Sequence, residues 1–161
     1  MPGGGLMQRE SVWDYPRPAI CERFEGGLKI VSGAGVLAQT TRGYRTVETS
    51  HPPSYYFPPE DVAMDLLVEN GHRSFCEWKG EARYFDLLVD GKTVRNVAWT
   101  YPEPSASFVP IRDYLSFYAS RVDACYVNEE RVRAQAGDFY GGWITANLVG
   151  PFKGPPGTGG W

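Results

Sequence analysis

The chain has 161 residues, of which 42% are hydrophobic and 22% are charged, and its formal net charge is −3. This length fits one domain, and the ordinary charge content excludes wholesale disorder. The mild acidity argues against a nucleic-acid-binding protein, which usually carries a basic face. Because 19 glycines and 13 prolines supply many turns, the composition favours an all-β or mixed fold.

The sequence has no feature of a secreted or membrane-spanning protein. No stretch approaches the roughly 20 apolar residues of a membrane span, and the N-terminal residues lack the basic and apolar regions of a signal peptide. Its three cysteines, Cys21, Cys76 and Cys125, are odd in number and far apart, unlike a secreted disulfide framework. We therefore predict a cytoplasmic protein with reduced thiols.

The N-terminal third predicts a leader followed by short strands. Residues 1–18 contain several prolines and glycines, which predicts a flexible leader, although Trp13 and Tyr15 could contact the body. Three short β-strands, separated by Gly or Ser turn residues, are predicted over residues 28–31, 35–40 and 44–48. His51 precedes a proline and should therefore lie in an extended, non-helical corner.

The middle of the chain predicts a β-hairpin. Pro59 and the acidic residues after it are typical of the start of a short helix. Strands are predicted over residues 74–78, 82–89 and 93–101, and Asp90-Gly91 is a strong hairpin turn signal between the last two. Apolar side chains fall on both faces of residues 82–89, which predicts a strand that is covered on two sides.

The next segment has the best helical pattern. Ile111, Tyr114, Leu115 and Tyr118 recur at i, i+3, i+4 and i+7, which predicts an amphipathic helix over residues 109–118. After it, strands over residues 122–127 and 131–134 could pair through a turn at Asn128-Glu129.

The C-terminal segment, residues 137–161, is rich in glycine but carries Phe139, Tyr140, Trp143, Phe152 and Trp161. Aromatic side chains bury large areas, so we expect this segment to pack on the body, where it could cover one side of a pocket or a neighbouring subunit. The predicted organisation is a leader over residues 1–18, a ligand-pocket domain over 19–136, and a packed extension over 137–161.

The first candidate functional segment is residues 48–58. Glu48 and His51 could form an acid–base pair, because a histidine titrates near neutral pH and a carboxylate can fix its tautomer. Tyr55 and Tyr56 add two phenols beside the proline-stiffened turn. The alternative is a structural corner in which His51 bonds the backbone and the tyrosines fill the core.

Two further segments carry chemistry. In residues 76–84, Lys79 places an amine at a turn beside a glycine, and Cys76 is either a nucleophile with a lowered pKa or, as free cysteines commonly are, a small buried hydrophobe. In residues 98–104, Trp99 and Tyr101 project from one face of a strand. They form either an aromatic-walled pocket suited to flat or cationic ligands or ordinary core.

Several motifs are absent. The chain has no phosphate-binding loop, no Rossmann glycine fingerprint, no nucleophile elbow and no His-Glu-x-x-His segment. Its cysteines and two histidines lack the spacing of a zinc site. We therefore predict neither a cofactor nor a metal.

Four blocks in order, SHPPSYYFPPEDVAMDLL, CEWKGEARYF, AWTYPEP and IRDYLSFY, resemble the bacterial and fungal family catalogued as domain of unknown function 427. The resemblance implies a β-tent fold, in which two antiparallel sheets meet at an angle with a ligand pocket between them. It also implies a set of pocket residues at the positions of the family motifs. These are Glu48, His51, Tyr55, Tyr56, Trp78, Lys79, Tyr84, Trp99 and Tyr101.

We therefore predict a mainly β, β-tent-like protein that binds a small polar or cationic molecule. One hypothesis is a small enzyme with Glu48, His51 and Lys79 as catalytic residues and the aromatic residues as ligand contacts. The second is a non-catalytic binding module with an aromatic cage, and the third is a protein-interaction adaptor. The expected partner is a small molecule, with a homodimer as a further option and no nucleic acid or membrane. If one site exists, His51, Lys79 and Trp99 should line one cavity.

Overall fold

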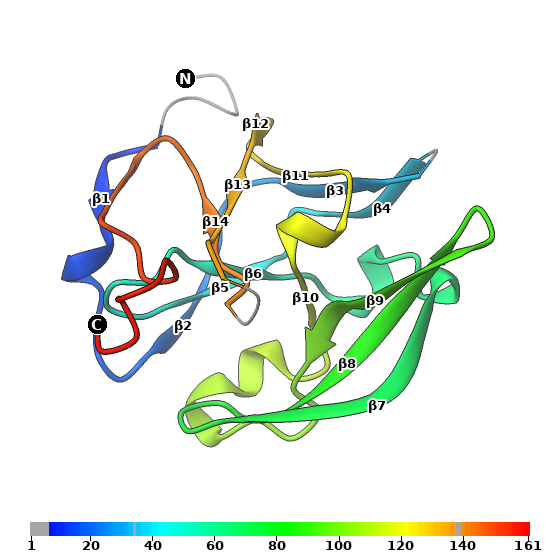
Figure 1. The fold of residues 1–161 in the computed structure, drawn as a ribbon, viewed down its shortest axis with the longest axis horizontal. Helices are drawn as coiled ribbons and strands as arrows, with labels where there is room; N and C mark the ends of the chain where they lie inside the picture. Colours follow the sequence, from blue (N-terminus) through cyan, green and yellow to red (C-terminus); the bar gives the residue numbers. More distant parts are fainter. Residues whose placement is uncertain (1–6, 34, 138–139) are drawn as a thin grey trace.

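The computed structural model describes residues 7–33, 35–137 and 140–161. The fold is mainly β, as predicted (Figure 1). Its strands form two four-stranded antiparallel sheets, a three-stranded antiparallel sheet and two strand pairs. The helical segments are short 3₁₀ turns, and none of the helices in the described ranges has the length and apolar character to span a membrane.

The first four-stranded sheet has the order β12-β11-β3-β4. Its strands are β3 (Leu28–Ser32), β4 (Gly35–Thr40), β11 (Ala124–Val127) and β12 (Glu130–Arg131). The predicted turn at Asn128-Glu129 connects β11 to β12, and both turn residues have positive φ values of 48° and 70°.

The second four-stranded sheet has the order β10-β9-β8-β7. Its strands are β7 (Leu67–Cys76), β8 (Gly80–Val89), β9 (Lys92–Thr100) and β10 (Leu115–Phe117). The predicted Asp90-Gly91 turn joins β8 to β9, with φ values of 51° and 71° that suit a two-residue hairpin. Short 3₁₀ turns η2 (Pro59–Asp61) and η3 (Met64–Leu66) precede β7, so the helix expected at Pro59 is a single turn.

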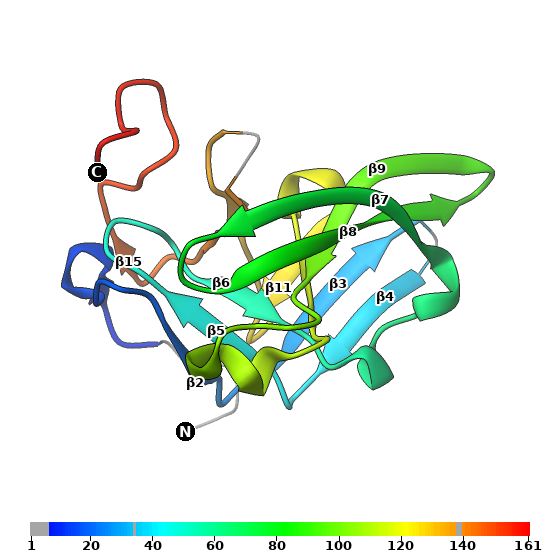
Figure 2. The same ribbon diagram turned by 90° about the horizontal axis from the view of Figure 1, so that it is seen from below.

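The main hydrophobic core lies between these two sheets, which meet at an angle (Figures 1 and 2). It includes Leu28, Ile30, Leu37, Leu87, Val97, Leu115, Phe117, Cys125 and Val127. Ala82 and Tyr84 of β8 belong instead to a second cluster on the other side of the sheet. Strand β8 is therefore covered on both faces, as its two-sided apolar pattern predicted.

The predicted helix over residues 109–118 is wrong. A 3₁₀ turn, η4 (Ala106–Ile111), contains Pro110 and ends at Ile111, and residues 115–117 form β10 instead. Pro110 has no N–H for a regular helix. Leu115 pairs with Thr100 of β9 and exchanges two backbone hydrogen bonds of 2.8 Å with Phe57. All three β10 side chains are buried, so strand pairing satisfies their backbone while both faces are covered.

The third sheet, β2-β5-β6, consists of β2 (Ile20–Arg23), β5 (Tyr44–Val47) and β6 (Ser54–Tyr56). It anchors the leader through an ion cluster. Arg45 donates from Nη1 to Glu10 Oε1 at 3.0 Å and from Nε to Glu22 Oε2 at 2.6 Å. The hydrogen bonds from Arg45 and Tyr15 outweigh the effect of burial and lower the pKa of Glu10.

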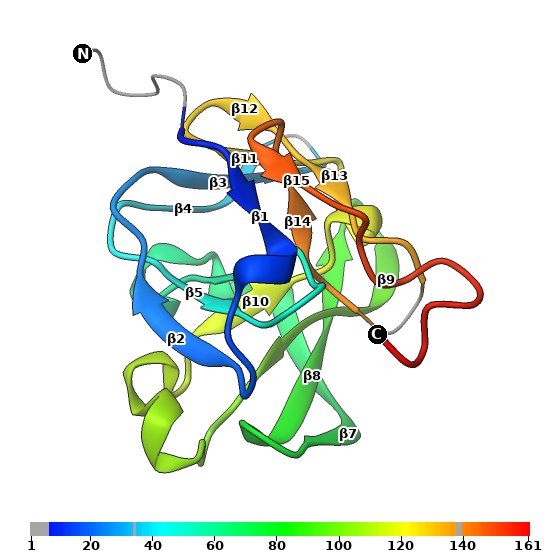
Figure 3. The same cartoon turned by 90° about the vertical axis from the view of Figure 1, so that its left-hand side faces the viewer.

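Strands from the N-terminal and C-terminal parts of the described chain lie side by side (Figure 3). Strand β1 (Glu10–Ser11) pairs in parallel with β15 (Leu148–Val149), and β13 (Arg133–Ala134) pairs with β14 (Trp143–Ile144). The turn η1 (Val12–Asp14) follows β1, and η5 (Ala119–Arg121) precedes β11. Trp13 donates from Nε1 to the Pro151 carbonyl at 2.7 Å, and its ring lies 5.4 Å from that of Trp161.

Candidate functional site

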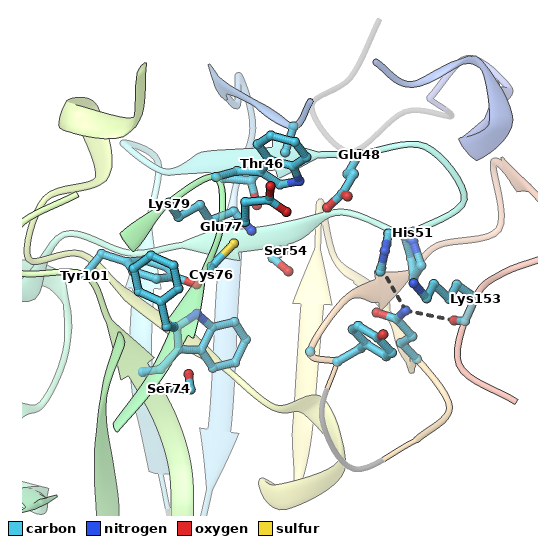
Figure 4. Close-up of a pocket in the computed structure, with 18 of the residues that line it drawn as sticks. Thr46, Glu48, His51, Ser54, Ser74, Cys76, Glu77, Lys79, Tyr101 and Lys153 are labelled. Carbon is cyan, nitrogen blue, oxygen red and sulfur yellow. Dashed lines mark hydrogen bonds between the residues drawn. The ribbon is translucent and has the colours of Figure 1, made fainter. Parts of the chain in front are cut away.

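A cavity of about 240 Å³ lies between the β2-β5-β6 sheet and the second four-stranded sheet (Figure 4). Its walls come from the end of β5 and the following turn, from the β7–β8 turn, from the inner face of β8 and β9, and from the C-terminal segment. The volume is slightly below the range of roughly 300–1,000 Å³ that is usual for ligand sites. The cavity therefore suits a small molecule.

Seven of the nine predicted pocket residues line this cavity: Glu48, His51, Trp78, Lys79, Tyr84, Trp99 and Tyr101. The geometric prediction that His51, Lys79 and Trp99 share one cavity is confirmed. What these side chains do there stays a prediction, because position in a cavity does not assign a role.

Tyr55 and Tyr56 are not among the residues that line the cavity. Tyr55 is 1% exposed in the main core, where its ring lies 5.1 Å from that of Phe24 and 5.3 Å from that of Trp143. Tyr56 is fully buried behind the cavity wall, 6.4 Å from the Trp99 ring. Burial raises the pKa of Tyr55 to about 12 and also raises that of Tyr56. Their position agrees with the alternative in which the tyrosines fill the core.

Glu48 and His51 face the cavity from a turn that neighbouring segments hold in place. The His51 N–H donates to the Glu48 carbonyl at 3.0 Å, which closes the turn. Ser50, between them, is completely buried and has a φ of 73°. Its N–H donates to the Val12 carbonyl, and its carbonyl accepts from the Lys153 N–H at 2.8 Å. The leader and the C-terminal segment thus both fix this turn.

Lys79 lies at the β7–β8 turn, which a second loop supports. Ser105 donates from Oγ to the Trp78 carbonyl at 2.5 Å and from its N–H to the Lys79 carbonyl at 3.0 Å. Gly80 closes the turn with a φ of 112°, a backbone conformation that residues with a side chain rarely adopt. The hydrogen bonds from Ser105 hold the turn in the conformation in which Lys79 lines the cavity.

Aromatic residues of the second cluster form the inner wall. The Trp99 ring lies 4.7 Å from the Tyr118 ring, and Tyr84 OH and Ser74 Oγ are 2.7 Å apart in a hydrogen bond. Burial raises the pKa of Tyr101 well above its ordinary value. The Tyr101 phenol therefore stays neutral at physiological pH and acts as a hydrogen-bonding or stacking group.

Sequence reasoning missed Gln135 and the cavity residues that the C-terminal segment contributes. Gln135, Tyr140, Gly141 and Lys153 all line the cavity. Lys153 lies on the side opposite Lys79 (Figure 4). The one available signal was the aromatic content of residues 137–161, which predicted packing on the body. Of the aromatic residues named there, Phe139 lies outside the described residues.

Two glycines let this segment approach the wall. A Cβ on Gly141 would lie 2.2 Å from the Trp99 ring, and one on Gly142 would lie 2.4 Å from the Pro52 carbonyl oxygen. Any other residue at either position would displace the segment or the wall that it covers.

Replacing Gly142 with alanine should lower the free energy of unfolding by about 1–2 kcal/mol, because the backbone oxygen of Pro52 cannot move away as a flexible side chain would. Urea denaturation followed by tryptophan fluorescence measures the change. Gly159→Ala is the control, since a Cβ there meets no atom within 4 Å. Equal stability of the two variants would contradict the close contact.

The ring of His51 is held by Gln135. Gln135 Nε2 lies 3.3 Å from His51 Nδ1, and the ring of Tyr140 packs at 5.0 Å from the imidazole. Burial lowers the pKa of His51 to about 4. The charge of Glu48 opposes this shift, whereas those of Lys153, Lys79 and Arg17 add to it. His51 is therefore neutral at physiological pH.

Four charged side chains line the cavity: Glu48, Glu77, Lys79 and Lys153. Among the described residues, none of the four is in an ion pair. Their charges thus remain available to groups of opposite charge on a bound molecule.

The cysteine thiols and the possible metal ligands do not form a further site within the described residues. Cys76 lines the cavity, while burial raises the pKa of Cys21 to about 11 and that of Cys125 to about 12. All three cysteines are free. Within the described part of the chain, no three His, Cys, Asp or Glu side chains gather as a metal site would require.

Comparison with known proteins agrees with the resemblance seen in the sequence. Residues 20–128 match the family model described as a domain of unknown function, DUF427. No curated protein matches the chain. The match covers all three sequence blocks that supply the predicted pocket residues. The chain therefore belongs to the DUF427 family.

Proposed function

We propose that this protein binds a small polar or charged molecule in the cavity between the β2-β5-β6 sheet and the second four-stranded sheet. The observation that supports this best is the convergence of His51, Lys79 and Trp99, from three separate sequence blocks, on one cavity of about 240 Å³. Residues brought together only by core packing would be shielded from solvent and uncharged. Here, in contrast, unpaired charges and aromatic rings share one concave surface, which is typical of a ligand site.

A screen with small molecules tests this proposal. The panel contains small aromatic and aliphatic acids, amines and neutral compounds, and the signals are the indole N–H resonances of Trp78 and Trp99 in two-dimensional NMR spectra. We expect a subset of the panel to shift these signals with saturable binding.

The variant Ser54→Tyr adds a ring to the cavity wall and should abolish those shifts. The control is Val68→Tyr, which adds a ring at an exposed position of β7 outside the lining. If the whole panel leaves the two indoles unchanged, or if Ser54→Tyr binds as well as Val68→Tyr, the proposal is wrong.

A second candidate is a small acid–base enzyme, favoured by the presence of Glu48, His51 and Lys79 around the same cavity. In this candidate Glu48 removes a proton from the ligand, neutral His51 donates a hydrogen bond to the oxygen that gains negative charge, and Lys79 stabilises that charge. Glu48 would be the base because the lowered pKa of His51 makes its imidazole a weak one.

Isotope exchange separates the two candidates. A compound that binds in the screen is incubated with the protein in D₂O and analysed by mass spectrometry. The enzyme candidate expects deuterium to replace a carbon-bound hydrogen of the compound and to remain there after return to H₂O, and Glu48→Gln should stop this exchange while binding persists. A compound that binds without exchange supports the binding protein alone.

A further inference from the structure

Only one orientation of the Gln135 side-chain amide satisfies its hydrogen-bond partners. Its side-chain oxygen accepts from the Gly142 N–H at 3.0 Å, and its nitrogen donates to the Lys153 carbonyl at 2.8 Å. Turning the amide over would place a donor against the Gly142 N–H and an acceptor against the Lys153 carbonyl. Gln135 is also only 5% exposed, so water cannot replace these partners freely.

This orientation determines the tautomer of His51. The second proton of Gln135 Nε2 faces His51 Nδ1 at 3.3 Å, so Nδ1 must be the hydrogen-bond acceptor. In a neutral imidazole the other nitrogen then carries the proton. Among the described residues, no group accepts a hydrogen bond from His51 Nε2. The Nε2–H group of His51, a residue of the cavity wall, can therefore donate a hydrogen bond to a ligand.

Among the groups that act most strongly on His51, positive charges outnumber negative ones, which favours a negative acceptor. Glu48 has the largest single charge effect on the ring, and Lys153, Lys79 and Arg17 oppose it with three positive charges. Lys153 is held close by, because its Nζ lies 5.3 Å above the centre of the Tyr140 ring, which itself packs against His51. Glu77, on the β7–β8 turn with Lys79, is a second acidic residue of the cavity wall, but it is not among the charges that act most strongly on His51.

We infer that the cavity selects a small aromatic carboxylate over an aromatic cation of the same shape, with Gln135 as the positioning residue that holds His51 as a hydrogen-bond donor. This inference rests on the proposed function and names the ligand class. The carboxylate accepts from His51 Nε2 and pairs with Lys153, and the ring of the ligand lies against Trp99 and Tyr101. The contacts that would favour a cation are limited to the aromatic faces, which bind neutral and anionic rings as well.

Three probes of similar size test the choice of charge: benzoate, benzyl alcohol and benzylammonium. Titrations at neutral pH follow the Trp99 indole N–H by NMR. Benzoate should bind about tenfold more tightly than benzyl alcohol, as one charge-assisted hydrogen bond would give. Benzylammonium should bind more weakly than either. Equal or tighter binding of benzylammonium, or no binding of benzoate, would overturn the inference.

The role of Gln135 has its own readout. Long-range ¹H–¹⁵N correlation spectra of the wild-type protein should show His51 protonated at Nε2. In Gln135→Glu a carboxylate faces Nδ1, so the proton should move to Nδ1 and the preference for benzoate over benzyl alcohol should disappear. Gln39→Glu adds the same charge at an exposed site on β4 and should retain both properties.

The outcomes separate this inference from the proposed function. Nδ1 protonation in the wild-type protein would refute the assigned tautomer even if Gln135→Glu did not fold. Binding of benzylammonium in preference to benzoate would refute the ligand class, yet it would leave the cavity as a small-molecule site. The broader screen with Ser54→Tyr decides that second question independently.

Discussion

Trp143→Ala is expected to lower the free energy of unfolding by about 4 kcal/mol, the middle of the range for removing a buried tryptophan. Trp143 is completely buried, and its ring lies 5.3 Å from Tyr55 and 6.1 Å from Phe57. Its Nε1 donates to the Phe117 carbonyl at 3.0 Å, so the variant also leaves a buried acceptor on β10 unpaired. Urea denaturation measured by circular dichroism gives the change directly.

The matched control for this prediction is Trp13→Ala. Trp13 has the same side chain and donates a hydrogen bond to the Pro151 carbonyl, but it is 41% exposed. We expect this variant to lose less than half as much stability, because a partly exposed ring removes less apolar surface from water. Similar losses in the two variants would show that the C-terminal segment does not complete the core.

Acidification is expected to destabilise the protein through His51. The folded-state pKa of about 4 lies below the ordinary value of 6.5, so the unfolded chain binds the proton more readily between these values. Stability is fully present above pH 6.5 and is lost as the pH falls towards 4. The expected contribution of this group is about 2–3 kcal/mol.

Comparing denaturation curves across this pH range isolates the histidine. His51→Gln should lose about 2–3 kcal/mol less than the wild-type protein on acidification, because glutamine does not titrate. Carboxylates such as Glu10 and Asp86, whose pKa values are lowered by hydrogen bonds, destabilise both proteins alike in acid. His72→Gln makes the same substitution at the exposed second histidine and controls for the loss of an imidazole as such. Parallel wild-type and His51→Gln curves would contradict a buried, neutral His51.

Local signals predicted the parts of the fold that depend on neighbouring residues. The Asp90-Gly91 turn could be predicted because few residue pairs accept two positive φ values in succession. The helix over 109–118 failed because its apolar spacing fits a turn followed by a strand as well. Periodicity cannot separate these when a strand such as β10 is buried on both faces, and the pairing with β9 that decides the outcome is distant in sequence.

The sequence predicted those residues of the candidate site whose side-chain type and motif alone indicate a functional role. Histidine, lysine and tryptophan in three motif blocks indicated one pocket, and those residues do line one cavity. Tyr55 and Tyr56 have equally suggestive side chains, but a strand sends neighbouring residues to opposite faces and both faces of β6 are covered. Gln135 has no motif around it, because its importance comes from three partners that only the folded chain assembles.

The C-terminal segment lies beyond the residues that define the family, which end at Asn128. Gln135, Tyr140 and Lys153 therefore complete the cavity from outside the family domain. In the proposed site, a chain with the same sheets and a different ending would lack the contacts of Gln135 and Lys153. The sheets and these contacts lie in separate stretches of sequence, so exchanging the ending between family members tests whether it sets the preference for a ligand.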